Sequence, residues 1–139
     1  VRVIDDFAHH PTAIRLAIKA FRQRYPDSRI WAIFEPRSNT TRRNIFQREL
    51  AEALAGADRA VVPAIADPGK FAEAERLDPE QLVRDVVSRG GEAVYIPSVG
   101  EIARYVAMHA EEDDVVAVLS NGGFGGLHEL LLSTLGERP

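Results

Sequence analysis

The sequence predicts a three-layer, Rossmann-like α/β domain, in which helices cover both faces of a mainly parallel sheet of five to six strands. Three observations lead to this prediction. Short apolar runs alternate five times with segments of helical periodicity. The run VVAVL at 115–119 is apolar throughout, as expected for a strand buried on both faces. The 139 residues, 45% hydrophobic and 27% charged, suit a single domain over 1–139.

Proline and turn-forming residues mark the limits of the first strand–helix unit. Residues 1–4 form an apolar strand, and Pro11 suits the first turn of a helix. Turn-forming residues at 25–28 (YPDS) end this helix, and the aromatic and β-branched run at 29–34 (RIWAIF) is a second strand. The inward face of the helix is expected to carry Ile14, Ala17, Ile18 and Phe21.

A second helix and a third strand follow. We expect Asn39 or Thr40 to cap this helix and Gly56 to end it. The run RAVVPAI at 59–65 is a third strand, although Pro63 weakens the prediction near its end. The apolar residues that share one face of the helix are Ile45, Phe46, Leu50 and Leu54.

The third helix is preceded by a polar segment. Residues 67–76 predict a mobile surface loop. Asp78 is then expected to cap the helix, with Pro79 in its first turn, and EAVYI at 92–96 is a fourth strand. The inward face of this helix is expected to carry Leu82, Val83, Val86 and Val87.

Two more helices complete the pattern. Ser98 is expected to cap the fourth, with Glu101 as its capping-box partner. The fifth strand is 115–119, and a glycine-rich loop leads from it into the last helix. The inward faces are expected to carry Ile102, Ala103 and Val106, and then Leu127, Leu130, Leu131 and Leu135.

Composition excludes several classes of function. The net charge is −4 and the basic residues form no single stripe, which argues against wholesale nucleic-acid binding. The absence of cysteine excludes disulfides and thiolate metal sites, and it fits a reducing cytoplasm. No apolar run approaches the ~20 residues that a membrane span requires. Because the chain begins within an apolar strand and without methionine, we expect a domain of a longer protein.

Four unusual stretches follow predicted strands. They are DDFAHHP after the first strand, EPRSNTTRR after the second, IADPGK after the third and SNGGFGG after the fifth. In open α/β sheets, ligands bind beyond the carboxyl ends of the strands. We therefore expect these stretches to converge on one ligand site.

The first stretch combines acids with imidazoles. Asp5 and Asp6 end a strand, where a carboxylate can accept hydrogen bonds from ribose hydroxyls or hold a metal. His9 and His10 precede a helix, where imidazoles can donate to phosphate oxygens. The simpler alternative is that one of these side chains caps the helix, which would explain one residue but not four.

The second stretch brings three arginines to the end of a strand. A guanidinium group is planar and matches carboxylate or phosphate geometry, so we predict anion recognition by Arg37 or Arg42. The alternative is a solvated helix surface, which suits Arg43 best.

The last stretch places four glycines within five residues, at 122–126. Such a loop lets the backbone approach a ligand, or forms a tight turn without one. The sequence has no P-loop, no Rossmann fingerprint after its first strand, no nucleophile elbow and no convincing zinc spacing. His109 and His128 lie on predicted helices and are assigned no role. The loops therefore predict ligand contacts without a complete set of catalytic residues.

The run DDFAHHPTAI resembles the start of the C-terminal domain in the Mur ligase family, the ATP-dependent amide ligases of peptidoglycan synthesis. The runs IFEPRSNTTRRNIFQREL and LSNGGFGGLHELLL resemble, more narrowly, the murein peptide ligases of that family. The resemblance extends from Asp5 to the last helix. It implies a three-domain enzyme, with domains for nucleotide sugar, ATP and the incoming amino component, of which this chain is the third.

The resemblance also implies a reaction and its participants. With ATP and Mg²⁺, the carboxylate of UDP-N-acetylmuramate becomes an acyl phosphate, which the amino group of the recycled tripeptide L-Ala-γ-D-Glu-meso-diaminopimelate attacks. ATP and Mg²⁺ would be bound mainly by the central domain. The residues implied to contact ATP are Asp6, His9 and His10. Those implied to border the peptide are Arg37, Ser38, Asn39, Thr40, Arg42, Asn121, Gly122 and Gly123, with the loop continuing to Gly126.

Three other interpretations stay open. One is a sister ligase that joins L-alanine to UDP-N-acetylmuramate. Another is a free-standing nucleotide- or sugar-phosphate-binding module, which measurable ATP affinity of the chain alone would favour. The third is a response-regulator receiver, with Asp67 as phospho-acceptor and Ser98 as switch hydroxyl. A receiver requires a lysine after its fifth strand, where this chain has SNG at 120–122.

Overall fold

The computed structural model describes residues 1–137, which contain one sheet of five parallel strands in the order β1-β5-β2-β3-β4. The predicted fold class is therefore confirmed. The strands are β1 (Arg2–Asp6), β2 (Ile30–Phe34), β3 (Arg59–Val62), β4 (Ala93–Tyr95) and β5 (Val115–Leu119). The α-helices are α1 (Pro11–Arg24), α2 (Gln47–Leu54), α3 (Pro79–Ser88), α4 (Val99–His109) and α5 (Leu127–Gly136). Within residues 1–137, no helix is both long and apolar enough to cross a membrane.

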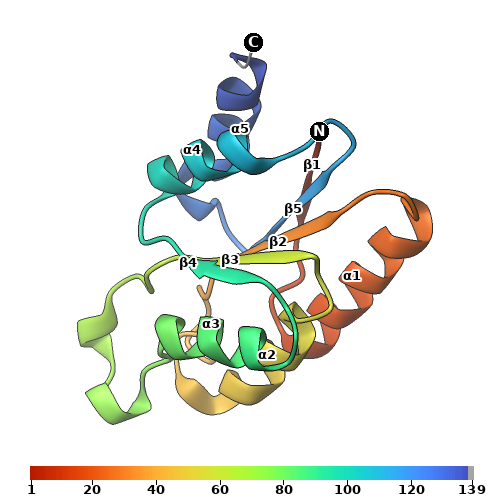
Figure 1. Cartoon of the computed structure of the whole chain (residues 1–139). Coiled ribbons are helices and arrows are strands. Elements are labelled where there is room, and N and C mark those ends of the chain that lie inside the picture. Colours follow the sequence, from red (N-terminus) through yellow and green to blue (C-terminus); the bar gives the residue numbers. More distant parts are fainter. Residues whose placement is uncertain (138–139) are drawn as a thin grey trace.

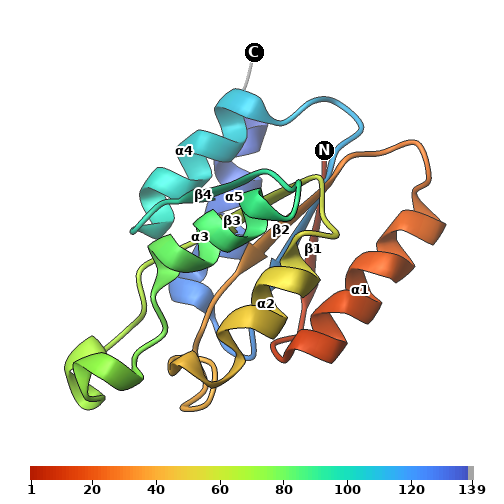
Figure 2. The same cartoon turned by 60° about the horizontal axis from the view of Figure 1, so that its bottom comes forward.

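The helices cover both faces of the sheet (Figure 1). α1, α2 and α3 lie on one face and α4 and α5 on the other, and the view in Figure 2 shows the same layers from another side. Successive side chains of a strand point to opposite faces, so each central strand supplies both cores. On β2, Ala32 and Phe34 pack toward α1–α3, whereas Trp31 and Ile33 pack toward α4 and α5.

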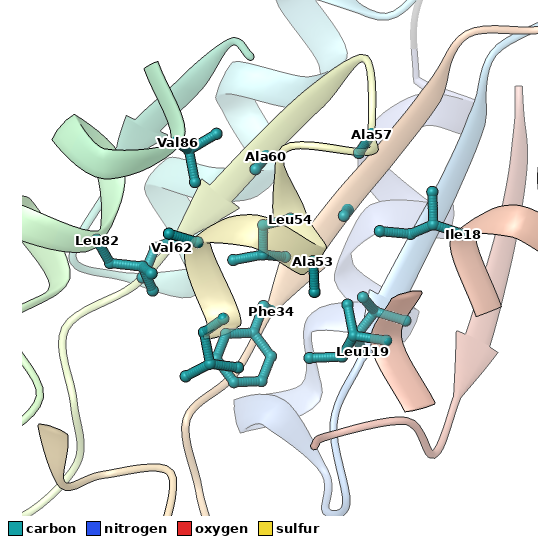
Figure 3. Packing of buried hydrophobic residues seen from close by; sticks show 14 of the residues in the cluster. Ile18, Phe34, Ala53, Leu54, Ala57, Ala60, Val62, Leu82, Val86 and Leu119 are labelled. Atoms are coloured by element: carbon teal, nitrogen blue, oxygen red, sulfur yellow. The ribbon is translucent and has the colours of Figure 1, made fainter. Parts of the chain in front are cut away.

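The larger hydrophobic cluster lies between the sheet and α1–α3 (Figure 3). Ile18, Leu54 and Leu82 come from the three helices, and they meet Phe34 and Leu119 of the central strands. These five side chains are at most 3% exposed. Truncating one of the aliphatic residues to alanine removes transfer free energy and leaves a cavity, at a cost of about 2–5 kcal/mol.

Two of the predicted helix starts are confirmed. The Asp78 carboxylate accepts a hydrogen bond from the Gln81 N–H at 3.0 Å, at the start of α3. The Ser98 hydroxyl accepts from the Glu101 N–H at 3.4 Å, at the start of α4. Each bond satisfies an N–H group that the first turn of a helix leaves without a partner.

The predicted start of the second helix is wrong. α2 begins at Gln47, after the short 3-10 helix η1 (Asn44–Phe46), and neither Asn39 nor Thr40 caps it. Residues 38–42 instead form a separate turn, in which the Ser38 hydroxyl accepts from the Thr41 N–H and the Ser38 carbonyl accepts from the Arg42 N–H, both at 3.0 Å. One consequence is that Ile45, predicted for the inward face, lies outside α2 and is 55% exposed.

Two further predictions need correction. The third strand ends at Val62 rather than at residue 65, consistent with the missing N–H of Pro63, which cannot donate to a neighbouring strand. Val87 does not face inward on α3 but is 52% exposed. The buried residues of α3 are Leu82 and Val86, and Val87 is one residue further around the helix from that face.

The polar segment 67–76 lies on the surface as predicted, with Phe71 as its one buried residue, and its mobility stays a prediction. It contains the 3-10 helices η2 (Pro68–Lys70) and η3 (Glu73–Glu75). Between them Phe71 is only 7% exposed, because the guanidinium groups of Arg42 and Arg43 lie 5.2 and 5.5 Å from the centre of its ring. Phe71 thus joins this segment to the loop that follows β2, together with hydrogen bonds such as that from Asn44 Nδ2 to the Ala74 carbonyl at 2.9 Å.

A buried ionic network closes the opposite, amino-terminal edge of the sheet. Asp114 is 2% exposed, and its carboxylate accepts from Arg29 Nε at 3.0 Å and Nη2 at 2.7 Å. It also accepts from Trp31 Nε1 at 2.8 Å and the Glu111 N–H at 2.9 Å. Burial alone would raise the pKa of Asp114, but the hydrogen bonds from Arg29, Glu111 and Trp31 together hold it below its ordinary value. The same pairing raises the pKa of Arg29.

Candidate functional site

Polar loop ends meet at the carboxyl edge of the sheet. The strands β1, β5 and β2 are neighbours, and Asp6, Leu119 and Phe34 stand side by side in their register. Because the strands are parallel, the loops that leave them emerge at the same edge, which Figure 2 shows at its lower end. The stretches after β1, β2 and β5 thus start at one edge of the sheet, as expected, and their binding of one shared ligand stays a prediction.

Hydrogen bonds tie the three strand ends together. The Ser120 N–H donates to the Asp6 carbonyl at 3.1 Å, and the Glu35 N–H donates to the Leu119 carbonyl at 3.0 Å. The Ser120 hydroxyl then donates to Glu35 Oε1 at 2.5 Å, a separation typical of a hydroxyl bound to a carboxylate. The loops therefore start from a fixed platform.

Asp6 is held by its own loop. Its Oδ1 accepts a hydrogen bond from the Ala8 N–H at 2.8 Å, which fixes the orientation of the carboxylate. Helix α1 begins at Pro11, and His10 occupies the cap position without any side-chain hydrogen bond. The alternative that these acids and imidazoles simply cap the helix is therefore wrong.

The two histidines belong to a row of rings. The His9 and His10 ring centres are 4.4 Å apart, and Phe7 and Phe46 extend the row at 6.2 and 6.0 Å. His9 Nδ1 lies 2.9 Å from the Phe7 carbonyl, and because a carbonyl only accepts, Nδ1 carries the proton in this bond. The row ends beside a hollow of about 310 Å³ between the starts of α1 and α2, lined in part by His10 and Phe46.

Arg37 carries an uncompensated positive charge at the end of β2. It is exposed, and within residues 1–137 it has no ion pair and no side-chain hydrogen bond. Its side chain lies across Gly122, where an added Cβ would stand 2.3 Å from Arg37 Nε. A free guanidinium supported by the neighbouring loop is suited to bind an anion.

The residues after Arg37 form a compact turn. Ser38 Oγ and Thr41 Oγ1 are 2.7 Å apart, and Thr41 is fully buried. Thr40 is half-buried, and its carbonyl accepts from the Arg43 N–H at 3.2 Å. The turn thus sets the direction of the loop beside Arg37.

Arg42 holds two loops together. It is 8% exposed, and it donates through Nη1 to the Ala66 carbonyl and through Nη2 to Asn39 Oδ1, both at 3.1 Å. Asn39 Oδ1 also accepts from Lys70 Nζ at 3.1 Å. Both terminal nitrogens of Arg42 are therefore engaged in internal contacts, whereas Arg37 is free.

The loop after β5 is strained and carries an unpaired acceptor. Asn121 Oδ1 is buried without a hydrogen-bond partner, an arrangement that costs about 1–3 kcal/mol until a donor is supplied. Further along, Phe124, Gly125 and Gly126 have positive φ angles of 47°, 57° and 77°. Phe124 is 2% exposed in the core beneath α4 and α5, so packing compensates for its strained backbone.

Sequence reasoning missed three contributors to this edge: Glu35, Ser120 and Lys70. Each lies within a stretch that the sequence singled out, and Glu35 and Ser120 directly follow buried strands. A polar residue at that position is the signal that could have identified them. Within the described part of the chain, no group of three or more His, Cys, Asp or Glu side chains is arranged to hold a metal ion.

The comparisons with known proteins agree with this architecture. A family model described as "Mur ligase, glutamate ligase domain" matches residues 1–122. The UDP-N-acetylmuramate–L-alanyl-γ-D-glutamyl-meso-2,6-diaminoheptanedioate ligase of Escherichia coli is 38% identical over 140 residues, which cover 99% of this chain. The chain spans only 28% of the length of that relative.

Two solved structures have the same fold. The murein peptide ligase of Psychrobacter arcticus superposes with a TM-score of 0.81 at 33% identity, over 97% of this chain and 27% of that one. A domain described as part of a UDP-N-acetylmuramate:L-alanyl-γ-D-glutamyl-meso-diaminopimelate ligase of Haemophilus ducreyi superposes with a TM-score of 0.70 at 34% identity. That match covers 96% of this chain and 89% of the other.

Proposed function

The chain belongs to the Mur ligase family, and on that premise we propose that it is the C-terminal domain of a longer, three-domain ATP-dependent amide ligase. The proposed reaction joins L-Ala-γ-D-Glu-meso-diaminopimelate to UDP-N-acetylmuramate through an acyl phosphate, in the recycling of peptidoglycan. Similarity to murein peptide ligases over nearly the whole chain supports this choice of substrates.

One observation carries the proposal. The two sides of β5 present different chemistry at a single edge of the sheet. On the β1 side lie the carboxylate of Asp6 and the histidine pair, and on the β2 side lies the unpaired guanidinium of Arg37. Such an edge can hold a nucleotide and an anionic peptide next to each other, as the transfer of an activated acyl group requires.

On the β1 side, the proposed ligand is ATP. Asp6 Oδ1 is occupied by the Ala8 N–H, so the carboxylate is held in place and Oδ2 is left to accept from a ribose hydroxyl. His9 and His10 stand just before the first turn of α1, where free N–H groups and the helix dipole favour phosphate oxygens. The residues present therefore fit a nucleotide.

On the β2 side, the proposed ligand is the tripeptide. Arg37 would pair with one of its carboxylates, and Ser38, Asn39 and Thr40 would border it from the same loop. Asn121 brings a buried acceptor that a peptide N–H could satisfy, and Gly122 and Gly123 let the backbone approach closely. For Arg42 we propose an indirect role, because its terminal nitrogens hold Asn39 and Ala66 in place.

The chain's own part in the reaction is to bind and to orient. Bound ATP would supply the phosphoryl group that activates the muramoyl carboxylate. The loop from Arg37 to Thr40 would hold the peptide with its amino group toward that carboxyl carbon, and closure against the other domains would exclude water from the acyl phosphate. Following the family resemblance, we assign Mg²⁺ mainly to the central domain. We accordingly expect the chain alone to bind ATP weakly and to be inactive.

Steady-state kinetics of the complete ligase test this assignment. Asp6→Ala should raise the KM for ATP about tenfold, and Arg37→Ala should raise the KM for tripeptide about 10- to 100-fold, since each removes a charged contact. The matched controls are Asp27→Ala and Arg24→Ala, because both residues are exposed at the opposite edge of the sheet. If neither site variant differs from its control, the site assignment is wrong.

Two other results would redirect the proposal. Preference for L-alanine over the tripeptide would indicate the alanine-adding ligases of the same family. Tight binding of ATP by residues 1–139 alone would indicate a free-standing nucleotide-binding module.

A further inference from the structure

We propose that Glu35 and Ser120 are positioning residues that hold Arg37 in its peptide-binding orientation through the backbone of Gly122. This inference rests on the proposed function of Arg37 and adds two residues to it. Neither Glu35 nor Ser120 needs to touch a substrate.

The Ser120 hydroxyl links Glu35 to the Gly122 N–H through two hydrogen bonds, a pair that we call the relay. Ser120 is 2% exposed, and its hydroxyl donates to Glu35 Oε1 at 2.5 Å while accepting from the Gly122 N–H at 3.0 Å. One hydroxyl thus connects a carboxylate at the end of β2 with a backbone amide two residues beyond the end of β5. The first bond is short, as expected for a hydroxyl bound to a charged carboxylate, and the second has an ordinary length.

Gly122 links the relay to Arg37. The Arg37 side chain lies over the bare Cα of Gly122, so close that an added Cβ would stand within 2.5 Å of both its Nε and its Cδ. Among the described residues this guanidinium has no ion pair and no side-chain hydrogen bond, so its packing over Gly122 is the observed contact that can orient it. Its direction therefore depends on where the backbone of residue 122 lies.

The relay is not required to hold the strands together. Backbone bonds already join the strand ends: the Glu35 N–H donates to the Leu119 carbonyl, and the Ser120 N–H donates to the Asp6 carbonyl. The Ser120 hydroxyl additionally fixes the position of the Gly122 backbone, in the loop that follows β5. Its loss should free Gly122, and with it Arg37, while leaving the sheet intact.

The kinetic test is a double-mutant cycle in the complete ligase. Ser120→Ala should raise the KM for tripeptide about tenfold, with much smaller changes in kcat and in the KM for ATP. In an Arg37→Ala background the same change should have no further effect, because the positioned group is gone. Glu35→Ala should behave like Ser120→Ala, whereas Glu35→Gln retains an acceptor oxygen and should recover most of the affinity.

A second readout does not depend on activity. In the chain of residues 1–139, amide hydrogen exchange of Gly122 should accelerate at least about tenfold in Ser120→Ala, while the amides of β5 stay protected. The urea midpoint of each variant shows whether it remains folded. If Ser120→Ala does not fold, Glu35→Ala tests the same relay.

The outcomes separate this inference from the function on which it rests. If Arg37→Ala raises the peptide KM but Ser120→Ala and Glu35→Ala do not, the relay is refuted and the proposed site stands. If the fold-increases in the tripeptide KM caused by Ser120→Ala and Arg37→Ala multiply in the double variant, the two residues act independently and the inference is overturned. If Arg37→Ala has no effect on the peptide KM, the peptide site itself is wrong, and the relay with it.

Discussion

Replacing Asp114 by asparagine should destabilise the fold through loss of its buried carboxylate. The carboxylate accepts four hydrogen bonds, two from Arg29 and one each from Trp31 and the Glu111 N–H. Asparagine offers a single side-chain oxygen, and its NH₂ group would face a donor. At least one charge-assisted bond is then lost, a change that costs about 1.5–3 kcal/mol, with a further cost for the donor left unpaired. The Arg29 side chain is 36% exposed, so water can hydrogen-bond to the guanidinium and offset part of this cost. We therefore expect the free energy of unfolding to fall by about 2–3 kcal/mol.

Urea unfolding at pH 7 measures this loss. The chain has one tryptophan, Trp31, which donates to Asp114, so its fluorescence reports directly on the network, and circular dichroism gives an independent probe. With an m-value of about 1–3 kcal/mol/M, the midpoint should fall by roughly 0.7–3 M. Asp113→Asn, at the exposed neighbouring position, is the matched control and should change the free energy of unfolding by no more than about 0.5 kcal/mol.

The pH dependence provides a sharper check. The folded-state pKa of Asp114 lies below its ordinary value, so the stabilisation is present above the unfolded pKa and is lost as the pH falls through the folded pKa. The difference in free energy of unfolding between the native chain and Asp114→Asn should therefore shrink from pH 7 toward pH 2. A difference that stays constant, or grows in acid, would refute the role assigned to this carboxylate.

Two other predictions concern single residues. Gly122→Ala should leave the free energy of unfolding within about 0.5 kcal/mol, because the crowded atom belongs to an exposed arginine that can move. In the complete ligase it should nevertheless raise the KM for tripeptide at least about threefold. Gly69→Ala, where an added Cβ meets nothing within 4 Å, is its control, and equal KM values for the two variants would contradict the placement of Arg37. Asp78→Ala should cost about 1 kcal/mol in urea unfolding because α3 loses its cap, and an unchanged midpoint would show that the bond to the Gln81 N–H contributes nothing.

The sequence predicted the strands and two helix starts correctly because these features depend on residues that are close together in the chain. Five apolar runs separated by helical periodicity predicted a mainly parallel sheet of five to six strands. Asp78 followed by Pro79, and Ser98 followed by Glu101, predicted two helix starts. Composition and spacing therefore reveal such features.

The determinants of the loops are not local. Ser120 and Glu35 are 85 residues apart in the sequence, and Asn39 and Lys70 are 31 apart, so neither pairing leaves a trace in residue spacing. Between β2 and α2, the buried Arg42 donates to the Ala66 carbonyl 24 residues away, a contact that helix propensity does not register. Sequence therefore predicted which loops form the candidate site but not which of their side chains are free to bind.

The most direct test of the proposed ligand site is a crystal structure of the complete ligase with ADP and tripeptide bound. We expect the Asp6 carboxylate to lie within hydrogen-bond distance of the ribose and the Arg37 guanidinium within ion-pair distance of a peptide carboxylate. A structure in which both ligands bind without touching the carboxyl edge of β1, β5 and β2 would contradict the proposed function.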